Sequence, residues 1–106
     1  MGVMSFGDDL PVWGGNSWLC RSLIANAIEE VGPRPYLLVM EKSFEQGYNH
    51  ADMQPLSSEE LIEFRNASIN WFRRNLHAHI ENDGLSKLFD QLVDLVGRRL
   101  ANLERN

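Results

Sequence analysis

Residues 55–84 constrain the fold of this chain more than any other stretch. Ser57 and Glu60 stand three residues apart, the spacing of a capping box in which each side chain binds the other's backbone amide. Leu56 and Leu61 flank this cap and are placed to form a hydrophobic staple. The apolar positions that follow recur at helical spacing and cover more than a narrow stripe. We therefore expect a central helix that packs against two or more neighbours.

A second long helix is predicted from residue 85 or 86 to residue 103, where leucine, valine and phenylalanine form a clean apolar stripe. The pair Asp83-Gly84 is predicted to end the first helix, because glycine readily adopts the left-handed conformation of a helix stop. The short connection predicts an antiparallel hairpin. Gly97 costs about 1 kcal/mol relative to alanine inside a helix, which suggests a close crossing there.

The first half of the chain predicts one clear helix and one ambiguous segment. Helical spacing covers 17–31, with Asn16 or Ser17 as the N-cap, and it places Asn26 on the polar face. Residues 35–46 repeat their apolar side chains at helical spacing, but positions 36–41 also fit a short buried strand. We favour helix, because the second half of this segment is rich in good helix formers.

The remaining segments give weaker signals. Residues 1–15 are predicted to be irregular, with one short extended piece at most and with Trp13 covering the core from outside. Residues 47–56 form the longest connection. The chain is therefore predicted to be a single all-α domain over 1–106, an irregular three- to four-helix bundle with at most one short strand.

The composition argues against a disulfide, a membrane span and a histidine metal site. Among the 106 residues Cys20 is the only cysteine, so no internal disulfide is possible, and we expect it to be a buried apolar residue. No apolar run approaches the roughly 18 residues of a membrane span, and the start lacks the pattern of a signal peptide. His77 and His79 lie on different faces of the helix and do not form a metal pair. We expect a cytoplasmic protein with no metal and no cofactor.

The net charge of −5 is unevenly distributed: residues 1–60 carry nine acids and three bases, and the rest carry six acids and seven bases. A protein that grips a nucleic-acid backbone normally shows the opposite bias. The acidic half suits either a basic protein partner or solubility alone. The candidate partner-binding residues are the acids of this half and one aromatic anchor: Glu29, Glu30, Glu41, Glu45, Tyr48, Asp52, Glu59 and Glu60.

In size, charge, cysteine content and helix content, the chain resembles small bacterial toxin-immunity proteins, such as those of contact-dependent growth inhibition systems. The resemblance implies a protein without catalytic activity that covers the active site of a basic nuclease toxin. Acidic side chains would speed association and block the substrate. Nothing in the sequence fixes the toxin, the stoichiometry or the oligomeric state.

A second resemblance concerns the segment from Arg74 through Asn75 to His79. It is similar to the Arg-Asn-x-x-x-His motif of the HEPN family, helical proteins that often act as metal-independent ribonucleases. The resemblance implies that Arg74 stabilises phosphate charge and that His79 acts as an acid or base. Helical geometry opposes it, because five residues turn the two side chains about 140° apart.

Overall fold

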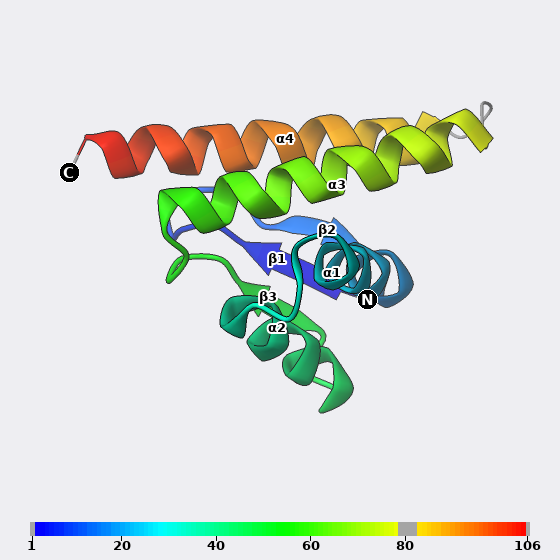
Figure 1. The fold of residues 1–106 in the computed structure, drawn as a ribbon. Coiled ribbons are helices and arrows are strands. Elements are labelled where there is room, and N and C mark those ends of the chain that lie inside the picture. Colours follow the sequence, from blue (N-terminus) through cyan, green and yellow to red (C-terminus); the bar gives the residue numbers. More distant parts are fainter. Residues whose placement is uncertain (1, 79–82, 106) are drawn as a thin grey trace.

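The computed structural model describes residues 2–78 and 83–105 (Figure 1). Two long helices run side by side along one side of the molecule, and a small sheet lies beneath them. Two shorter helices complete the core. In chain order the elements are β1 (Gly2–Ser5), β2 (Trp13–Gly15), α1 (Ser17–Val31), α2 (Pro35–Glu45), β3 (His50–Asp52), α3 (Ser58–Ala78) and α4 (Asp83–Glu104).

The sheet corrects the predicted fold class. Strand β1 lies in the centre, antiparallel to β2 and parallel to β3, with Met4 opposite Trp13 on one side and Ala51 on the other. The molecule is therefore mainly helical, but it is not the all-α bundle that the sequence predicted. The strands have three or four residues each, too few for an alternating pattern to stand out in the sequence.

The helices of the first half are confirmed. Helix α1 has the predicted bounds, and Asn16 caps it by accepting a hydrogen bond of 2.6 Å from the amide of Leu19. The ambiguous segment forms helix α2 and not a strand. Helix α2 packs against α1 and β3, on the side of the sheet away from α3 and α4 (Figure 1).

The capping box of the central helix is also confirmed. The amide of Ser57 donates to Glu60 Oε1 at 2.9 Å, and the amide of Glu60 donates to Ser57 Oγ at 3.2 Å. Leu56 and Leu61 are both buried beside it. Helix α3 packs against α1 and runs antiparallel to α4, as the predicted hairpin requires (Figure 1).

Three predictions about individual residues are wrong. Asp83 and Gly84 do not end the central helix, because both belong to the start of α4. Gly97 marks no close crossing: it is exposed, and an added Cβ would meet nothing within 4 Å. Trp13 lies inside the core with 1% of its surface exposed, and its Nε1 donates to the carbonyl oxygen of Leu88 at 2.8 Å.

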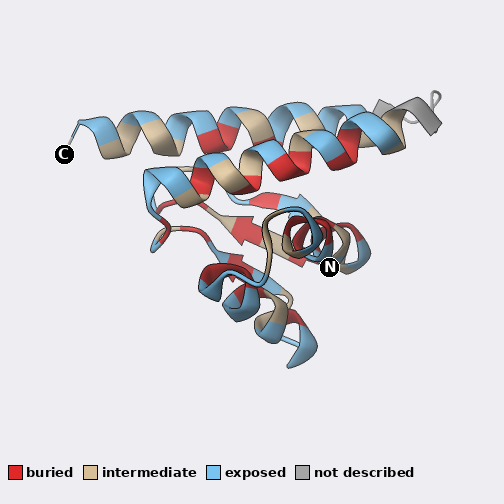
Figure 2. Ribbon diagram, in the orientation of Figure 1, coloured by how far each residue is buried: buried red, intermediate tan, exposed pale blue. Residues whose placement is uncertain are grey.

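The core lies between the helices and the sheet (Figure 2). Its largest fully buried side chains include Trp13, Phe6, Phe64 and Phe72, contributed by the N-terminal segment and by α3. None of the helices within the described ranges combines the length and the hydropathy that crossing a membrane requires.

Candidate functional site

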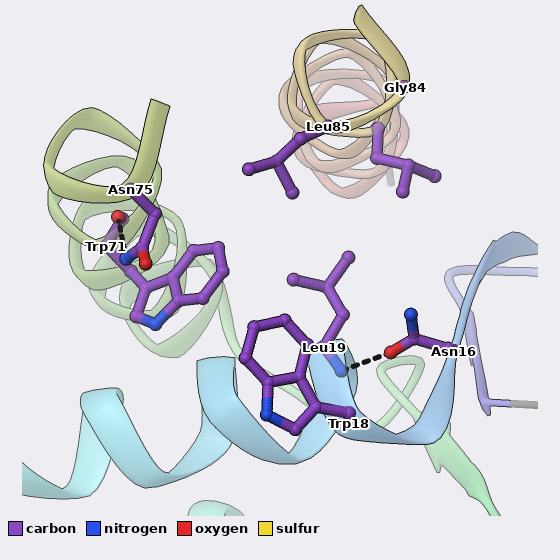
Figure 3. Close-up of a pocket in the computed structure, with 8 residues that line it drawn as sticks. Asn16, Trp18, Leu19, Trp71, Asn75, Gly84 and Leu85 are labelled. Carbon is purple, nitrogen blue, oxygen red and sulfur yellow. Dashed lines mark hydrogen bonds between the residues drawn. The ribbon is translucent and has the colours of Figure 1, made fainter. Parts of the chain in front are cut away.

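A hollow of about 350 Å³ opens where the start of α1 meets the last turns of α3 and the first turns of α4 (Figure 3). Trp18 and Leu19 form its floor in this view, Trp71 and Asn75 lie on one side, and Leu85 closes it from above. Sequence reasoning missed this hollow, because its lining comes from three separate segments of the chain.

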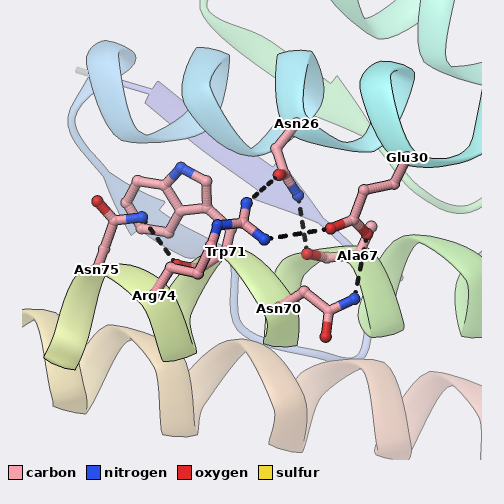
Figure 4. A network of polar contacts seen from close by, with 7 residues as sticks. All are labelled: Asn26, Glu30, Ala67, Asn70, Trp71, Arg74 and Asn75. Atoms are coloured by element: carbon pink, nitrogen blue, oxygen red, sulfur yellow. Dashed lines mark hydrogen bonds and ion pairs between the residues drawn. The ribbon is translucent and has the colours of Figure 1, made fainter.

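A polar network joins α1 to α3 (Figure 4). Asn26, which is only 6% exposed, donates from Nδ2 to the carbonyl oxygen of Ala67 at 2.9 Å. Its Oδ1 accepts from Arg74 Nη2 at 2.5 Å. The prediction that Asn26 lies on a polar outer face is therefore wrong, because these two bonds satisfy a buried amide.

The same network holds Glu30, one of the predicted partner-binding acids. Glu30 accepts from Arg74 Nη1 at 3.5 Å and from Asn70 Nδ2 at 3.3 Å. An acid in the last turn of a helix is disfavoured by the helix dipole, and the nearby guanidinium offsets this cost. We call Asn26, Glu30, Asn70 and Arg74 the α1–α3 seam.

The structure describes Arg74 and Asn75 of the HEPN-like motif. The guanidinium of Arg74 contacts Asn26 and Glu30 within the α1–α3 seam, and its side chain is 58% exposed. Asn75 donates to the carbonyl oxygen of Trp71 at 2.8 Å. His79 lies outside the described residues.

The end of α2 sets the position of Tyr48. Gly47 has a φ of +87°, and its amide donates to the carbonyl oxygen of Phe44. The amide of Tyr48 donates to the carbonyl oxygen of Ser43. This is the Schellman pattern that ends many helices. It leaves Tyr48 on the turn beyond α2 with 73% of its surface exposed.

Positions around α2 that are exposed or half-buried carry both apolar and acidic side chains. Leu38 and Val39 are 43% and 69% exposed, although both are apolar. Glu41 and Glu45 lie three and seven positions after Leu38, on the same side of the helix. Among the described residues, neither of these two acids forms a salt bridge. We call Leu38, Val39, Glu41, Glu45 and Tyr48 the α2 surface.

The other predicted acids are spread over the molecule. Glu29 is exposed at the end of α1, and Asp52 is exposed on β3, where its Oδ1 accepts from the amide of Gln54 at 3.0 Å. Glu59 and Glu60 line a separate hollow of about 250 Å³ beside the start of α2. Three of the eight predicted residues, Glu41, Glu45 and Tyr48, thus lie on α2 or on the turn directly after it.

Sequence reasoning missed a charged cluster between α2 and α3. Glu63 accepts two hydrogen bonds from Arg34, both at 3.2 Å, and one from the hydroxyl of Tyr36 at 2.9 Å. Burial acts to raise the pKa of Glu63, but the hydrogen bonds from Arg34 and Tyr36 and the charge of Arg34 outweigh it and lower the pKa. Burial, followed by the bond to Glu63, raises the pKa of Tyr36.

Cys20 is fully buried, as predicted. Burial raises the pKa of its thiol to about 11, so the thiol stays protonated and unreactive at neutral pH. In the described ranges, no group of three or more histidine, cysteine, aspartate or glutamate side chains is arranged to hold a metal ion.

Comparison with known proteins adds no relative. The chain matches no protein-family model, no curated protein and no solved structure.

Proposed function

We propose that this chain is a cytoplasmic immunity protein that binds a basic toxin domain, such as a nuclease, and covers its active site. The observation that carries the proposal is the α2 surface, where three apolar side chains are exposed beside carboxylates that form no salt bridge within the described chain. Protein interfaces combine apolar anchors with a polar rim in this way.

Charge favours a basic partner. The acids Glu41 and Glu45 share α2 with the single base Lys42, and they line a hollow with Arg21 of α1, a described residue with which neither forms a salt bridge. The chain as a whole carries a net charge of −5. Complementary charge of this kind accelerates association and suppresses the wrong partners. Tyr48 supplies an aromatic anchor of the type that often dominates binding energy.

The test uses a basic toxin domain, which the proposal expects a neighbouring gene to encode. Reversing Glu41 and Glu45 to lysine should weaken binding by at least about tenfold and abolish protection of growth. The matched control reverses Asp90 and Glu104, two exposed acids of α4, and changes the net charge by the same amount. Binding should also weaken as salt rises.

Two results would contradict the proposal. Equal loss of binding in both double variants would mean that net charge matters and the α2 surface does not. Cleavage of RNA by the purified chain, abolished by His79→Ala, would favour the HEPN-like alternative instead.

A further inference from the structure

The hollow between α1, α3 and α4 has the properties of a small-molecule site that is separate from the α2 surface. Its volume of about 350 Å³ falls at the lower end of the range of ligand pockets, roughly 300–1,000 Å³. The eight lining residues within the described chain are two tryptophans, three leucines, two asparagines and a glycine, and none of these eight is charged. The lining therefore suits an uncharged ligand.

The two tryptophans form a fixed aromatic wall. The rings of Trp18 and Trp71 meet edge to face, with centroids 6.1 Å apart and planes at 65°. The ring of Trp71 also packs edge to face against Phe72, with centroids 5.2 Å apart and planes at 89°. Trp18 nevertheless keeps 65% of its surface exposed, which is unusual for so large an apolar side chain. A flat ring placed in the hollow would cover part of this surface.

Two asparagines at opposite sides of the hollow leave one polar group each unused (Figure 3). Asn16 must turn its Oδ1 toward the amide of Leu19, so its Nδ2 remains, and this nitrogen donates to no described residue. Asn75 must turn its Nδ2 toward the carbonyl oxygen of Trp71, so its Oδ1 remains and accepts from no described residue. The hollow thus offers one donor and one acceptor on different sides.

We propose that this hollow binds a neutral, planar heteroaromatic molecule of two fused rings. The ring faces would pack against Trp18, Trp71 and the leucines. A ring N–H would donate to Asn75 Oδ1, and a ring nitrogen on the opposite edge would accept from Asn16 Nδ2. Asn16 is exposed and Asn75 is half-buried in the free chain. The bound ring would cover both amides, and a ligand that covers a polar group without pairing it is disfavoured, so this pair of amides would select among rings of equal size.

The test compares three probes of similar size at pH 8. Benzimidazole carries both the donor and the acceptor, indole carries only the donor, and N-methylbenzimidazole carries only the acceptor. Benzimidazole should bind most tightly, with a Kd on the order of 0.1–1 mM for a ligand of about nine heavy atoms. In NMR spectra, the indole N–H signals of Trp18 and Trp71 should move more than that of Trp13.

Variants test whether benzimidazole binds in the hollow and not at another exposed aromatic side chain. Trp18→Ala should weaken benzimidazole binding at least about fivefold, because base-sized rings gain much of their affinity from stacking. Tyr48→Ala removes an equally exposed aromatic residue outside the hollow and should leave binding unchanged. Asn75→Leu should remove the preference for benzimidazole over its N-methyl derivative, a readout that applies even if Trp18→Ala does not fold.

Equal binding of the three probes would overturn the proposal, as would unchanged binding in Trp18→Ala. A failure here would leave the proposed toxin binding untouched, because the hollow shares no residue with the α2 surface.

Discussion

The α1–α3 seam and the α2 surface both carry carboxylates on helices, but they use them differently. In the seam, Glu30 is bonded to Arg74 and Asn70, and the buried amide of Asn26 is bonded at both ends. On the α2 surface, Glu41 and Glu45 have no such partners in the described chain and stand beside exposed apolar residues. The seam therefore holds the fold together, and the α2 surface remains available to another molecule.

Among substitutions within the seam and the α2 surface, Asn26→Ala has the largest expected effect on stability, and it tests the structural half of this comparison. The change removes both hydrogen bonds of the buried Asn26 amide, so Arg74 loses the partner to which it makes its shortest hydrogen bond. We expect the free energy of unfolding to fall by about 2 kcal/mol, measured by urea denaturation.

The control for Asn26→Ala is Asn66→Ala, an exposed asparagine on α3. Its stability should stay within about 0.5 kcal/mol of the unmodified chain. Equal effects of the two substitutions would mean that the seam contributes no more to the free energy of unfolding than ordinary surface residues do.

Gly97→Ala extends the comparison to α4, where a helical glycine faces open space. Alanine should raise the free energy of unfolding by about 1 kcal/mol, because it restricts the unfolded chain and favours helix. Thermal denaturation would detect the change as an increase in Tm.

Gly2→Ala is the matched opposite of Gly97→Ala. Its Cβ would lie 2.9 Å from Cys20 Sγ and 3.1 Å from Ser17 Cα, closer than packing allows. This variant should be less stable than the unmodified chain. A stabilised Gly2→Ala would show that the contact between β1 and α1 is looser than described.

Glu63→Gln tests a carboxylate that has hydrogen-bond partners, for comparison with Glu45, which forms no salt bridge in the described chain. The folded state lowers the pKa of Glu63 below its ordinary value of about 4.5, so its contribution to stability is present above that pH and is lost as the pH falls through the folded-state value. In Glu63→Gln this acid-dependent loss should be absent. The effect at neutral pH should be under about 1 kcal/mol, since Arg34 is half exposed.

The control for Glu63→Gln is Glu45→Gln, measured by urea denaturation across the same pH range. Glu45 forms no salt bridge within the described chain, so its loss should leave the pH profile unchanged. Parallel profiles for the two variants would remove the distinction between paired and unpaired acids.

Val39→Gln should have the smallest effect on stability, within about 0.5 kcal/mol, because this side chain is 69% exposed. It should still weaken binding of the proposed toxin partner. The neighbouring Leu37 is fully buried, and Leu37→Gln should destabilise the fold by several kcal/mol, about 3 or more. Clear destabilisation by Val39→Gln would show that the α2 surface has a structural role.

Helices were predictable here because their signals are local and repeated. The cap at Asn16 and the capping box at Ser57 each identify a boundary from a few neighbouring residues. Strand β3 carries no such signal: its three residues, His50 to Asp52, include no β-branched or aromatic side chain. Its pairing with β1 depends on contacts between distant parts of the chain.

Prediction of the candidate site from the sequence has the same limit, because it also depends on contacts between distant residues. The sequence identifies acidic residues, but only the fold separates Glu30, which is bonded within the seam, from Glu45, which is not. Asn26 occupies a position whose helical spacing matches the polar face, and its burial depends on α3 packing against it. Side-chain partners across helices are a tertiary property that periodicity cannot supply.

The central position of β1 has a consequence for how this protein is made. Strand β1 is synthesised before β2 and β3, but Val3 pairs with His50, nearly half the chain away. Helices α1 and α2 emerge between the two strands and need only local contacts to begin forming. We therefore expect completion of the sheet to be a late step in folding, with β1 held by β2 alone until the segment beyond α2 has been synthesised.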